Sequence, residues 1–350
     1  MDRLGSRQLD QFRDLGYVAP LDVLSPERAM VLLDAIDDYL AAEAVLDTFD
    51  LTDPILIREV VGDDGGKRFE YADVPNPAPT VFPFFFNIWR HDDRFREVAF
   101  DPGPAVVAKQ LLGADEVLLM EDNIVVKEPH TGPVPFHQDY SYWPLDRPSA
   151  VTLWIALGDM DAARGSMQIV PRSHLLGERL PVSFGDGRSL MAEHWPHATE
   201  VPTAPDADGH ELHSYEFTSG QGGFHDAMVW HGSTPNTSYL RRSAYVIRYV
   251  VAGSIWQGGV RMPYDDIDCA PGEPLTESHF PRVADAASSC TCTMGGASVA
   301  HRARRLRLHL WRPSRRYRAT RWRRGRRCGG RLHRTARRRP AGVARRPRRR

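Results

Sequence analysis

A series of short apolar segments after Gly113 constrains the fold of this chain more than any other feature. Strand-rich runs such as VLLMEDNIVVKEP, SAVTLWIALGDM and RRSAYVIRYVVAG are rich in Val, Ile, Trp and Tyr, and turn-forming residues separate them. Short strands with regular turns between them are typical of antiparallel sandwiches and barrels, including the jelly roll. We therefore predict a β core over residues 113–255.

The residues before this core carry helical patterns. In the segment 25–44, Ser25 is a candidate N-cap, a proline follows it, and the apolar residues form a helical stripe. We predict helices over 6–16, 25–44 and 93–112. The predicted fold is therefore mainly β, with a helical front (residues 1–112) packed on the β core.

The charge of the chain is divided between two regions. Residues 301–350 hold 23 of the 45 basic residues and no Asp or Glu. Residues 1–300 therefore carry 22 basic against 45 acidic residues, a formal net charge of −23. Because such an acidic domain repels polyanions, we expect no nucleic acid partner for it, whereas the arginine-rich end would bind polyanions.

The composition changes abruptly near residues 284–296, and three of the four cysteines lie at or beyond this point. We interpret the segment 284–350 as an out-of-frame translation of GC-rich coding sequence, whose codons give mainly Arg, Pro, Gly and Ala. A basic arm for RNA, DNA or an acidic surface is the alternative. Both interpretations predict disorder, because this segment cannot bury apolar surface. We therefore predict one domain over 1–283, followed by a disordered tail.

Metal ligation is the strongest chemical signal in the sequence. The segment FHQDYSYWP contains His137 and Asp139. Residues i and i+2 of a strand face the same side, so both side chains are expected to reach one metal ion. The segment VWHGSTPN supplies His231 at the end of another apolar run. Two imidazoles and one carboxylate form the facial triad of non-haem Fe(II) oxygenases, which leaves coordination positions open.

Three stretches of the sequence resemble the phytanoyl-CoA dioxygenase family of Fe(II)- and 2-oxoglutarate-dependent oxygenases. They are KEPHTGPVPFHQDYSYWP, SAVTLWIALGDMDAARGSMQIVPRSHLLG and HDAMVWHGSTPNTSYLRRSAYVIRYV, and the resemblance runs from about Leu9 to about Val283. It implies a double-stranded β-helix, which is a cupin-like jelly roll. It also implies that His137, Asp139 and His231 bind Fe(II), with 2-oxoglutarate as the cosubstrate.

The resemblance also implies residues that bind the cosubstrate. Arg242, eleven residues after His231, matches the arginine that binds the far carboxylate of 2-oxoglutarate, and its planar guanidinium suits bidentate carboxylate binding. Trp154 and Asn123 match further cosubstrate contacts, with a core aromatic residue as the alternative for Trp154. Gln138 follows the family's His-Gln-Asp pattern and is expected to brace the metal-binding strand.

Strand alternation separates Arg242 from its neighbours. Arg241 is predicted to face the opposite side of the strand, so only one of the two can bind the cosubstrate. Arg248 shares a face with Arg242 and either lines the same cavity or lies at the surface. Lys127 is a further candidate for a substrate or cosubstrate contact, with an ordinary exposed lysine as the alternative. The aromatic residues after the metal-binding strand either line the substrate pocket or pack in the core: Tyr140, Tyr142 and Trp143.

The carboxylate at position 139 indicates hydroxylation, because the halogenating relatives carry a small residue at that position. We therefore expect a dioxygenase, an oxidoreductase that uses O2 to hydroxylate an aliphatic C–H bond and releases succinate and CO2. The resemblance implies a small-molecule or acyl substrate, and nothing in the sequence requires coenzyme A.

Two alternative functions remain open. A zinc-binding β-barrel, hydrolytic or structural, would use the same three ligands, but it has no need of Arg242. A polyanion-binding protein would act through its basic tail. The sequence has no run of about 18 apolar residues and no signal-peptide pattern at its start. We therefore expect no membrane partner and, with only four cysteines, a cytoplasmic protein.

Overall fold

The structure is a computed structural model that describes residues 1–41, 55–61, 67–73, 84–182, 199–258, 267 and 269–283. The chain divides into two compact units, Met1–Thr293 and Met294–Arg350, and every described residue lies in the first. The predicted tail over 284–350 lies outside the described residues. Its disorder and its origin therefore stay predictions.

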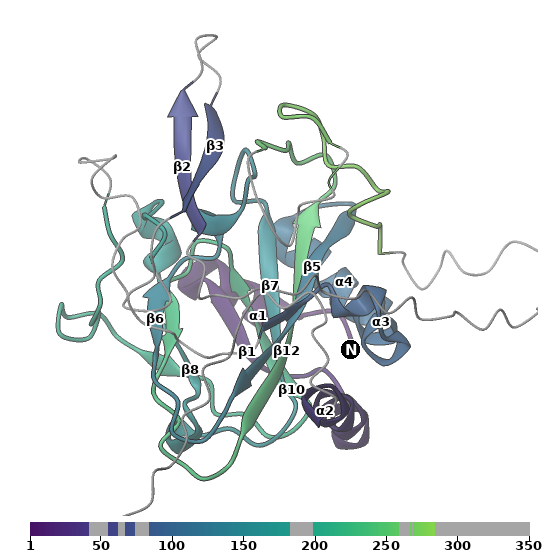
Figure 1. Ribbon diagram of the computed structural model, residues 1–350, viewed down its shortest axis with the longest axis vertical. Coiled ribbons are helices and arrows are strands. Elements are labelled where there is room, and N and C mark those ends of the chain that lie inside the picture. The colour runs from purple at the N-terminus through teal and green to yellow at the C-terminus, as the bar shows by residue number, and fades with distance from the viewer. Residues whose placement is uncertain are drawn as a thin grey trace, which may run out of the picture. The chain divides into compact units, whose positions relative to one another are not determined.

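Two antiparallel sheets form the centre of the first unit (Figure 1). The larger has the order β1-β10-β7-β12-β5-β4, and the smaller has the order β6-β11-β8-β9. The strands of the larger sheet are β1 (Tyr17–Asp22), β4 (Phe84–Phe86), β5 (Val117–Lys127), β7 (Ala150–Ala156), β10 (Gln221–Asp226) and β12 (Arg242–Val251). Those of the smaller sheet are β6 (Val134–His137), β8 (Met167–Ile169), β9 (His213–Ser214) and β11 (His231–Ser233). A separate hairpin pairs β2 (Ile55–Val61) with β3 (Lys67–Asp73).

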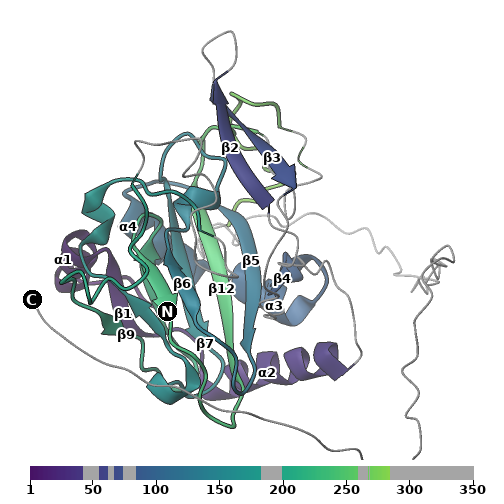
Figure 2. The ribbon, with the colours of Figure 1, turned by 60° about the vertical axis from the view of Figure 1, so that its left-hand side comes forward.

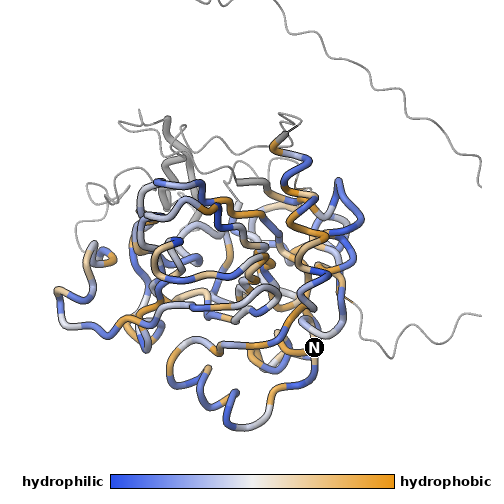
Figure 3. The backbone as a smooth tube through the Cα atoms, turned by 90° about the horizontal axis from the view of Figure 1, so that it is seen from below, coloured by the Kyte–Doolittle hydropathy of each residue, from blue (hydrophilic) through white to orange (hydrophobic). Residues whose placement is uncertain are grey.

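The larger sheet has a different core on each of its faces. On β12, Tyr245 and Ile247 belong to the core that the sheet shares with the helices. Ala244 and Val246 belong to the core between the two sheets. Because side chains alternate along a strand, Arg242 also faces the inside of the sandwich. Figure 3 shows that hydrophobic and hydrophilic stretches alternate along the chain, as expected for elements with one face in a core.

Helices cover the outer face of the larger sheet (Figure 2). They are α1 (Ser6–Leu15), α2 (Pro26–Ala41), α3 (Asp93–Ala99) and α4 (Pro102–Leu112). Short 3-10 turns connect other elements: η1 (Ile88–Arg90), η2 (Tyr140–Tyr142), η3 (Ala162–Arg164) and η4 (Ser173–Leu176). The expected helix over 6–16 is confirmed with its end one residue earlier, where Gly16 takes the left-handed conformation at φ 81°. The end of the expected helix over 25–44 lies outside the described residues.

The prediction of one helix over 93–112 is wrong, because two helices meet there. The Asp101 side chain accepts a hydrogen bond from the backbone N–H of Gly103 at 2.7 Å and caps α4. Pro102 follows at the first helical position, where its missing N–H costs nothing. The same proline cannot continue α3, because its ring would collide with the preceding turn.

The predicted helical front also supplies strands. β1 and β4 lie at the two edges of the larger sheet, β1 beside β10 and β4 beside β5. The rest of the two sheets comes from the predicted β core. Two facing antiparallel sheets with helices on one outer face form the predicted double-stranded β-helix. No described helix is long and apolar enough to span a membrane.

Candidate metal centre

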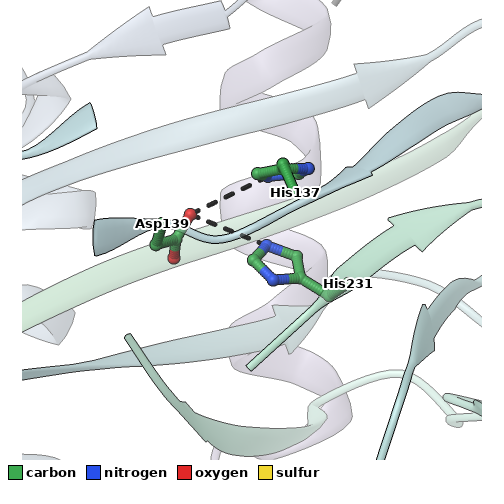
Figure 4. A group of neighbouring side chains, drawn as sticks. All are labelled: His137, Asp139 and His231. Carbon is green, nitrogen blue, oxygen red and sulfur yellow. Dashed lines mark ion pairs between the residues drawn. The ribbon is translucent and has the colours of Figure 1, made fainter. Parts of the chain in front are cut away.

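Three side chains from neighbouring segments converge between the sheets (Figure 4). His137 ends β6 and His231 begins β11, and the two residues are partners in the antiparallel register. The Nε2 atoms of His137 and His231 lie 3.9 and 3.6 Å from Oδ1 of Asp139. One ligand atom from each of the three residues lies within 4.8 Å of the others, and all three side chains are buried.

His137 and Asp139 do not lie on one strand, as predicted from their spacing. β6 ends at His137, and Asp139 has helical backbone angles (φ −61°, ψ −43°) at the start of η2. The two side chains therefore meet because the chain turns after the strand, and not because they alternate along it. Gln138 between them is held by the backbone, since its amide donates to the carbonyls of Gly177 and Met228 at 3.0 and 2.7 Å.

The two histidines have the protonation state that a metal requires. Nδ1 of His137 lies 2.8 Å from the carbonyl oxygen of Pro135, and Nδ1 of His231 lies 3.1 Å from that of Val229. A proton on each Nδ1 is donated to these carbonyls, which leaves the Nε2 lone pairs facing Asp139. Burial lowers the pKa of His137 to about 3 and that of His231 to about 4. Both imidazoles are therefore neutral near pH 7.

Asp139 is the negative member of the cluster. Burial alone would raise its pKa, but Arg248, His231 and His225 outweigh this effect and hold the pKa well below its usual range. Its Oδ2 accepts a hydrogen bond from Oγ1 of Thr152 at 2.6 Å. The donor set is thus two neutral imidazole nitrogens and one carboxylate oxygen. This set fits Fe(II) with open coordination positions, and it also fits catalytic zinc.

Arg242 and Lys127 form a second polar cluster on the inner face of the larger sheet. The side chain of Arg242 is 3% exposed, and it donates to the carbonyl oxygen of Gly165 at 2.7 Å. The guanidinium carbon lies 5.3 Å from the centre of the Trp154 ring. Within the described residues, Nε of Arg242 has no hydrogen-bond partner and no carboxylate forms an ion pair with this side chain. A buried guanidinium of this kind fits an anionic ligand.

Lys127 lies opposite Arg242 on β5 and is fully buried. Its Nζ donates to Oγ of Ser233 at 2.7 Å and to the carbonyl of Thr234. Gly165 closes this cluster: its φ is +69°, and an added Cβ would lie 2.7 Å from the carbonyl oxygen of Thr234. A side chain at position 165 would therefore collide with the backbone beside both cations.

Asn123 and Arg248 lie on the same inner face, closer to the metal ligands. Asn123 accepts a hydrogen bond from Arg248 at 2.5 Å, and its Nδ2 has no hydrogen-bond partner among the described residues. Arg248 also pairs with Glu121 at 3.1 Å and lies 3.7 Å from Oδ2 of Asp139. Arg248 is therefore not the surface residue that one interpretation of the sequence allowed.

The remaining predicted residues have mainly local contacts. Arg241 directly precedes β12, points away from Arg242 as alternation predicts, and forms ion pairs with Asp37 and Glu128. The Tyr142 ring lies 5.9 Å from that of His137, and its hydroxyl donates to the carbonyl of Val182 at 2.6 Å. Tyr140 and Trp143 pack in or against an apolar cluster that includes Trp256 and Phe280. Whether these aromatic side chains line a substrate pocket stays a prediction.

Two residues beside the ligands, His225 and Thr152, were not predicted from the sequence. His225 lies in the run GGFHDAMVWHGS, six residues before His231, and is 1% exposed. The two residues are partners in the register of β10 and β7. His225 could have been predicted as a site residue, because it is a second histidine in the short apolar run that contains His231. A single threonine in a strand gives no such indication for Thr152.

Comparisons with known proteins agree with this geometry. A protein of Stutzerimonas stutzeri, described as a probable alpha-ketoglutarate-dependent hypophosphite dioxygenase, is 28% identical over 139 residues. The match covers 39% of this chain and 46% of that protein, which is less than half of its length.

Two solved structures from nogalamycin biosynthesis share the fold. The alpha-ketoglutarate-dependent carbocyclase SnoK is 24% identical, with a TM-score of 0.58 over 80% of this chain and 97% of that one. The epimerase SnoN, solved with Fe3+, alpha-ketoglutarate and nogalamycin RO, is 23% identical, with a TM-score of 0.59 over 79% and 98%. The family model for phytanoyl-CoA dioxygenase matches residues 12–244, more than half of the sequence. This chain therefore belongs to the phytanoyl-CoA dioxygenase family.

Proposed function

We propose that this protein is an Fe(II)- and 2-oxoglutarate-dependent dioxygenase that hydroxylates an aliphatic C–H bond of a small-molecule or acyl substrate and releases succinate and CO2. The convergence of ligand atoms from His137, Asp139 and His231 within 4.8 Å is the observation that carries the proposal. The buried cations Lys127 and Arg242, on the same inner side of the fold, distinguish a cosubstrate-using site from a bare metal site.

The three ligands would hold the metal from one side. Nε2 of His137, Nε2 of His231 and a carboxylate oxygen of Asp139 leave the remaining coordination positions for the cosubstrate and O2. When bound, Fe(II) and 2-oxoglutarate would together activate O2, the oxidant that is needed to hydroxylate the substrate C–H bond. The protein contributes a neutral pair of imidazoles, a charged carboxylate and a buried position that excludes bulk water.

We assign the far carboxylate of 2-oxoglutarate to Arg242, with Lys127 as a second cation. The strand β11 links the two clusters, because His231 begins it and Ser233, which accepts from Lys127, ends it. Trp154 packs against the guanidinium of Arg242 and acts on the cosubstrate through that contact. The cosubstrates named for the Stutzerimonas protein and for the SnoN structure support this assignment.

Asn123 is proposed to contact the cosubstrate near the metal. Its Nδ2 is a buried donor with no hydrogen-bond partner among the described residues, and its Oδ1 is held by Arg248. An incoming carboxylate would satisfy the free donor. Gln138, in contrast, is proposed to support the site only by fixing the chain between the two ligands, because backbone groups occupy its amide.

The test is a visible spectrum of the purified full-length protein under anaerobic conditions. Fe(II) and 2-oxoglutarate together should give a weak charge-transfer band that neither gives alone, and admitting O2 should release succinate. The protein reconstituted with Zn(II) serves as the control without this band. If the protein binds Zn(II) tightly but gives no band with Fe(II) and 2-oxoglutarate, the zinc-binding alternative replaces the proposal.

A further inference from the structure

A fourth buried side chain, His225, lies beside the three proposed ligands. Its ring centre is 4.5 Å from that of His231, and its Nε2 lies 3.5 Å from Oδ2 of Asp139. Nδ1 of His225 has no hydrogen-bond partner in the part of the chain that the structure describes, and Asp139 is the carboxylate that its Nε2 faces. Leaving a buried polar atom unpaired costs about 1–3 kcal/mol, so packing alone does not explain an imidazole at this position.

Thr152 lies beside His225 and contacts the same carboxylate oxygen. The two residues are cross-strand partners on β7 and β10, so their side chains leave the same face of the larger sheet. The Thr152 hydroxyl donates to Oδ2 of Asp139 at 2.6 Å. Nε of Arg248 lies 3.7 Å from the same atom. Three side chains that carry donors thus surround Oδ2.

The other oxygen of Asp139 has different neighbours. Oδ1 lies 3.9 and 3.6 Å from the Nε2 atoms of His137 and His231. The carboxylate is therefore oriented with one oxygen toward the ligand atoms and the other toward the sheet. A carboxylate that turned and bound through both oxygens would occupy one more coordination position, which the cosubstrate and O2 need.

We propose that His225 and Thr152 are positioning residues that hold Asp139 through Oδ2, so that Oδ1 alone is presented to the metal. The Nε2–H tautomer of His225 supplies one donor and the Thr152 hydroxyl supplies the other. The inference rests on the proposed function, because it assumes that Asp139 is a metal ligand. Partners of this kind orient a ligand and tune its basicity, and their loss weakens metal binding about 10–100-fold.

The experiment measures the dissociation constant and visible spectrum of Co(II) bound to the full-length protein without 2-oxoglutarate. His225→Phe keeps a planar ring without donors, and Thr152→Val keeps the shape of threonine without its hydroxyl. Each should weaken Co(II) binding about 10–100-fold and alter the Co(II) absorption bands. His225→Gln and Thr152→Ser each keep a donor, so they should bind within a few-fold of the wild-type protein.

A matched control is His213→Phe. His213 stacks on Tyr17 with ring centres 4.9 Å apart and lies outside the group of proposed ligands. Its replacement by another ring should leave Co(II) binding unchanged. Thermal unfolding of every variant shows which are folded, and Thr152→Val tests the same oxygen should His225→Phe not fold.

Three results would overturn the inference. Folded His225→Phe and Thr152→Val proteins that bind Co(II) like the wild type, with the same spectrum, would show that the pair only packs. Loss of one coordinated nitrogen in His225→Phe, seen by X-ray absorption, would make His225 a ligand instead. A wild-type protein that binds neither Co(II) nor Fe(II) would refute the proposed function as well, and the other two results would not.

Discussion

Lys127 and Arg242 are cross-strand partners on β5 and β12, and both side chains are buried on the inner face of the larger sheet. Burial, and then the positive charge of Arg242, lower the pKa of Lys127 to about 7. Burial lowers the pKa of Arg242 to about 10. Two buried cations side by side are costly unless an anion binds between them. The pair is therefore suited to a carboxylate that arrives with the cosubstrate.

The affinity for 2-oxoglutarate should fall above about pH 7. In the free protein Lys127 loses its proton there, whereas a bound dianion favours the protonated form, so binding takes up a proton as the pH rises. The limiting slope is about tenfold per pH unit. Titrations of the anaerobic Fe(II) protein with 2-oxoglutarate, from about pH 6.5 to about pH 8.5, would measure this slope. Lys127→Met keeps the apolar stem and should remove the slope; a slope that persists in this variant would contradict the role of Lys127.

Arg242→Ala should raise the concentration of 2-oxoglutarate needed for half-saturation by about 10–100-fold, because hydrogen bonds to charged groups contribute about 1.5–3 kcal/mol. Arg241→Ala is the matched control on the next residue. Arg241 forms ion pairs with Asp37 and Glu128 at the partly exposed surface, and such pairs contribute about 0–1 kcal/mol. Succinate release as a function of 2-oxoglutarate concentration checks both. A large effect of Arg241→Ala with a small effect of Arg242→Ala would refute the assignment.

The fold and the faces of its strands follow from local patterns in the sequence. Val, Ile and aromatic residues in short runs predict the two sheets, and the period of two separates Arg241 from Arg242. The division between α3 and α4 could also have been predicted, because an Asp followed by a Pro is typical of a helix N-terminus.

The details of the metal centre depend on tertiary structure, and the sequence could not supply them. Asp139 reaches the histidines through a turn that follows β6. Its helical backbone angles therefore differ from the extended strand that the prediction from residue spacing assumed. His225 and Thr152 meet only through the register of β10 and β7. Register between distant segments is set by the packing of whole strands, which no short motif encodes.

The metal-free protein should lose stability in acid through its buried histidines. An unfolded histidine titrates near pH 6.5, at about its ordinary pKa, whereas His231 in the folded protein stays neutral down to about pH 4. Between these values the unfolded chain binds more protons, so the free energy of unfolding falls as the pH falls. The contribution of His231 is about 1.4 kcal/mol per pH unit.

Asp122 opposes this trend, because burial raises its pKa to about 7 and its folded form takes up a proton in the same range. The comparison of wild type with His231→Gln isolates the histidine. Urea unfolding of both proteins without metal, at about pH 7 and about pH 5, should give a smaller change for the variant. Equal changes would mean that His231 is protonated in the folded protein.

Asp139→Ala should abolish succinate release and weaken Fe(II) binding by at least about 100-fold, because it removes the anionic ligand and leaves two neutral imidazoles. Asp161→Ala provides a matched control, since Asp161 caps the short turn η3 and lies outside the group of proposed ligands. Anaerobic metal titrations and oxygen-dependent succinate release measure the two effects. Turnover at the wild-type rate in Asp139→Ala would rule out this carboxylate as a ligand.

Deleting residues 285–350 should leave the iron and 2-oxoglutarate chemistry intact, because every proposed site residue lies between Asn123 and Arg248. The same deletion removes the run of arginines and should abolish salt-sensitive binding to a polyanion such as heparin. The charge-transfer band and heparin retention of the full-length and shortened proteins would be measured side by side. A shortened protein that is folded but gives no band would show that the arginine-rich segment contributes to the site, contrary to our interpretation of it as out-of-frame sequence.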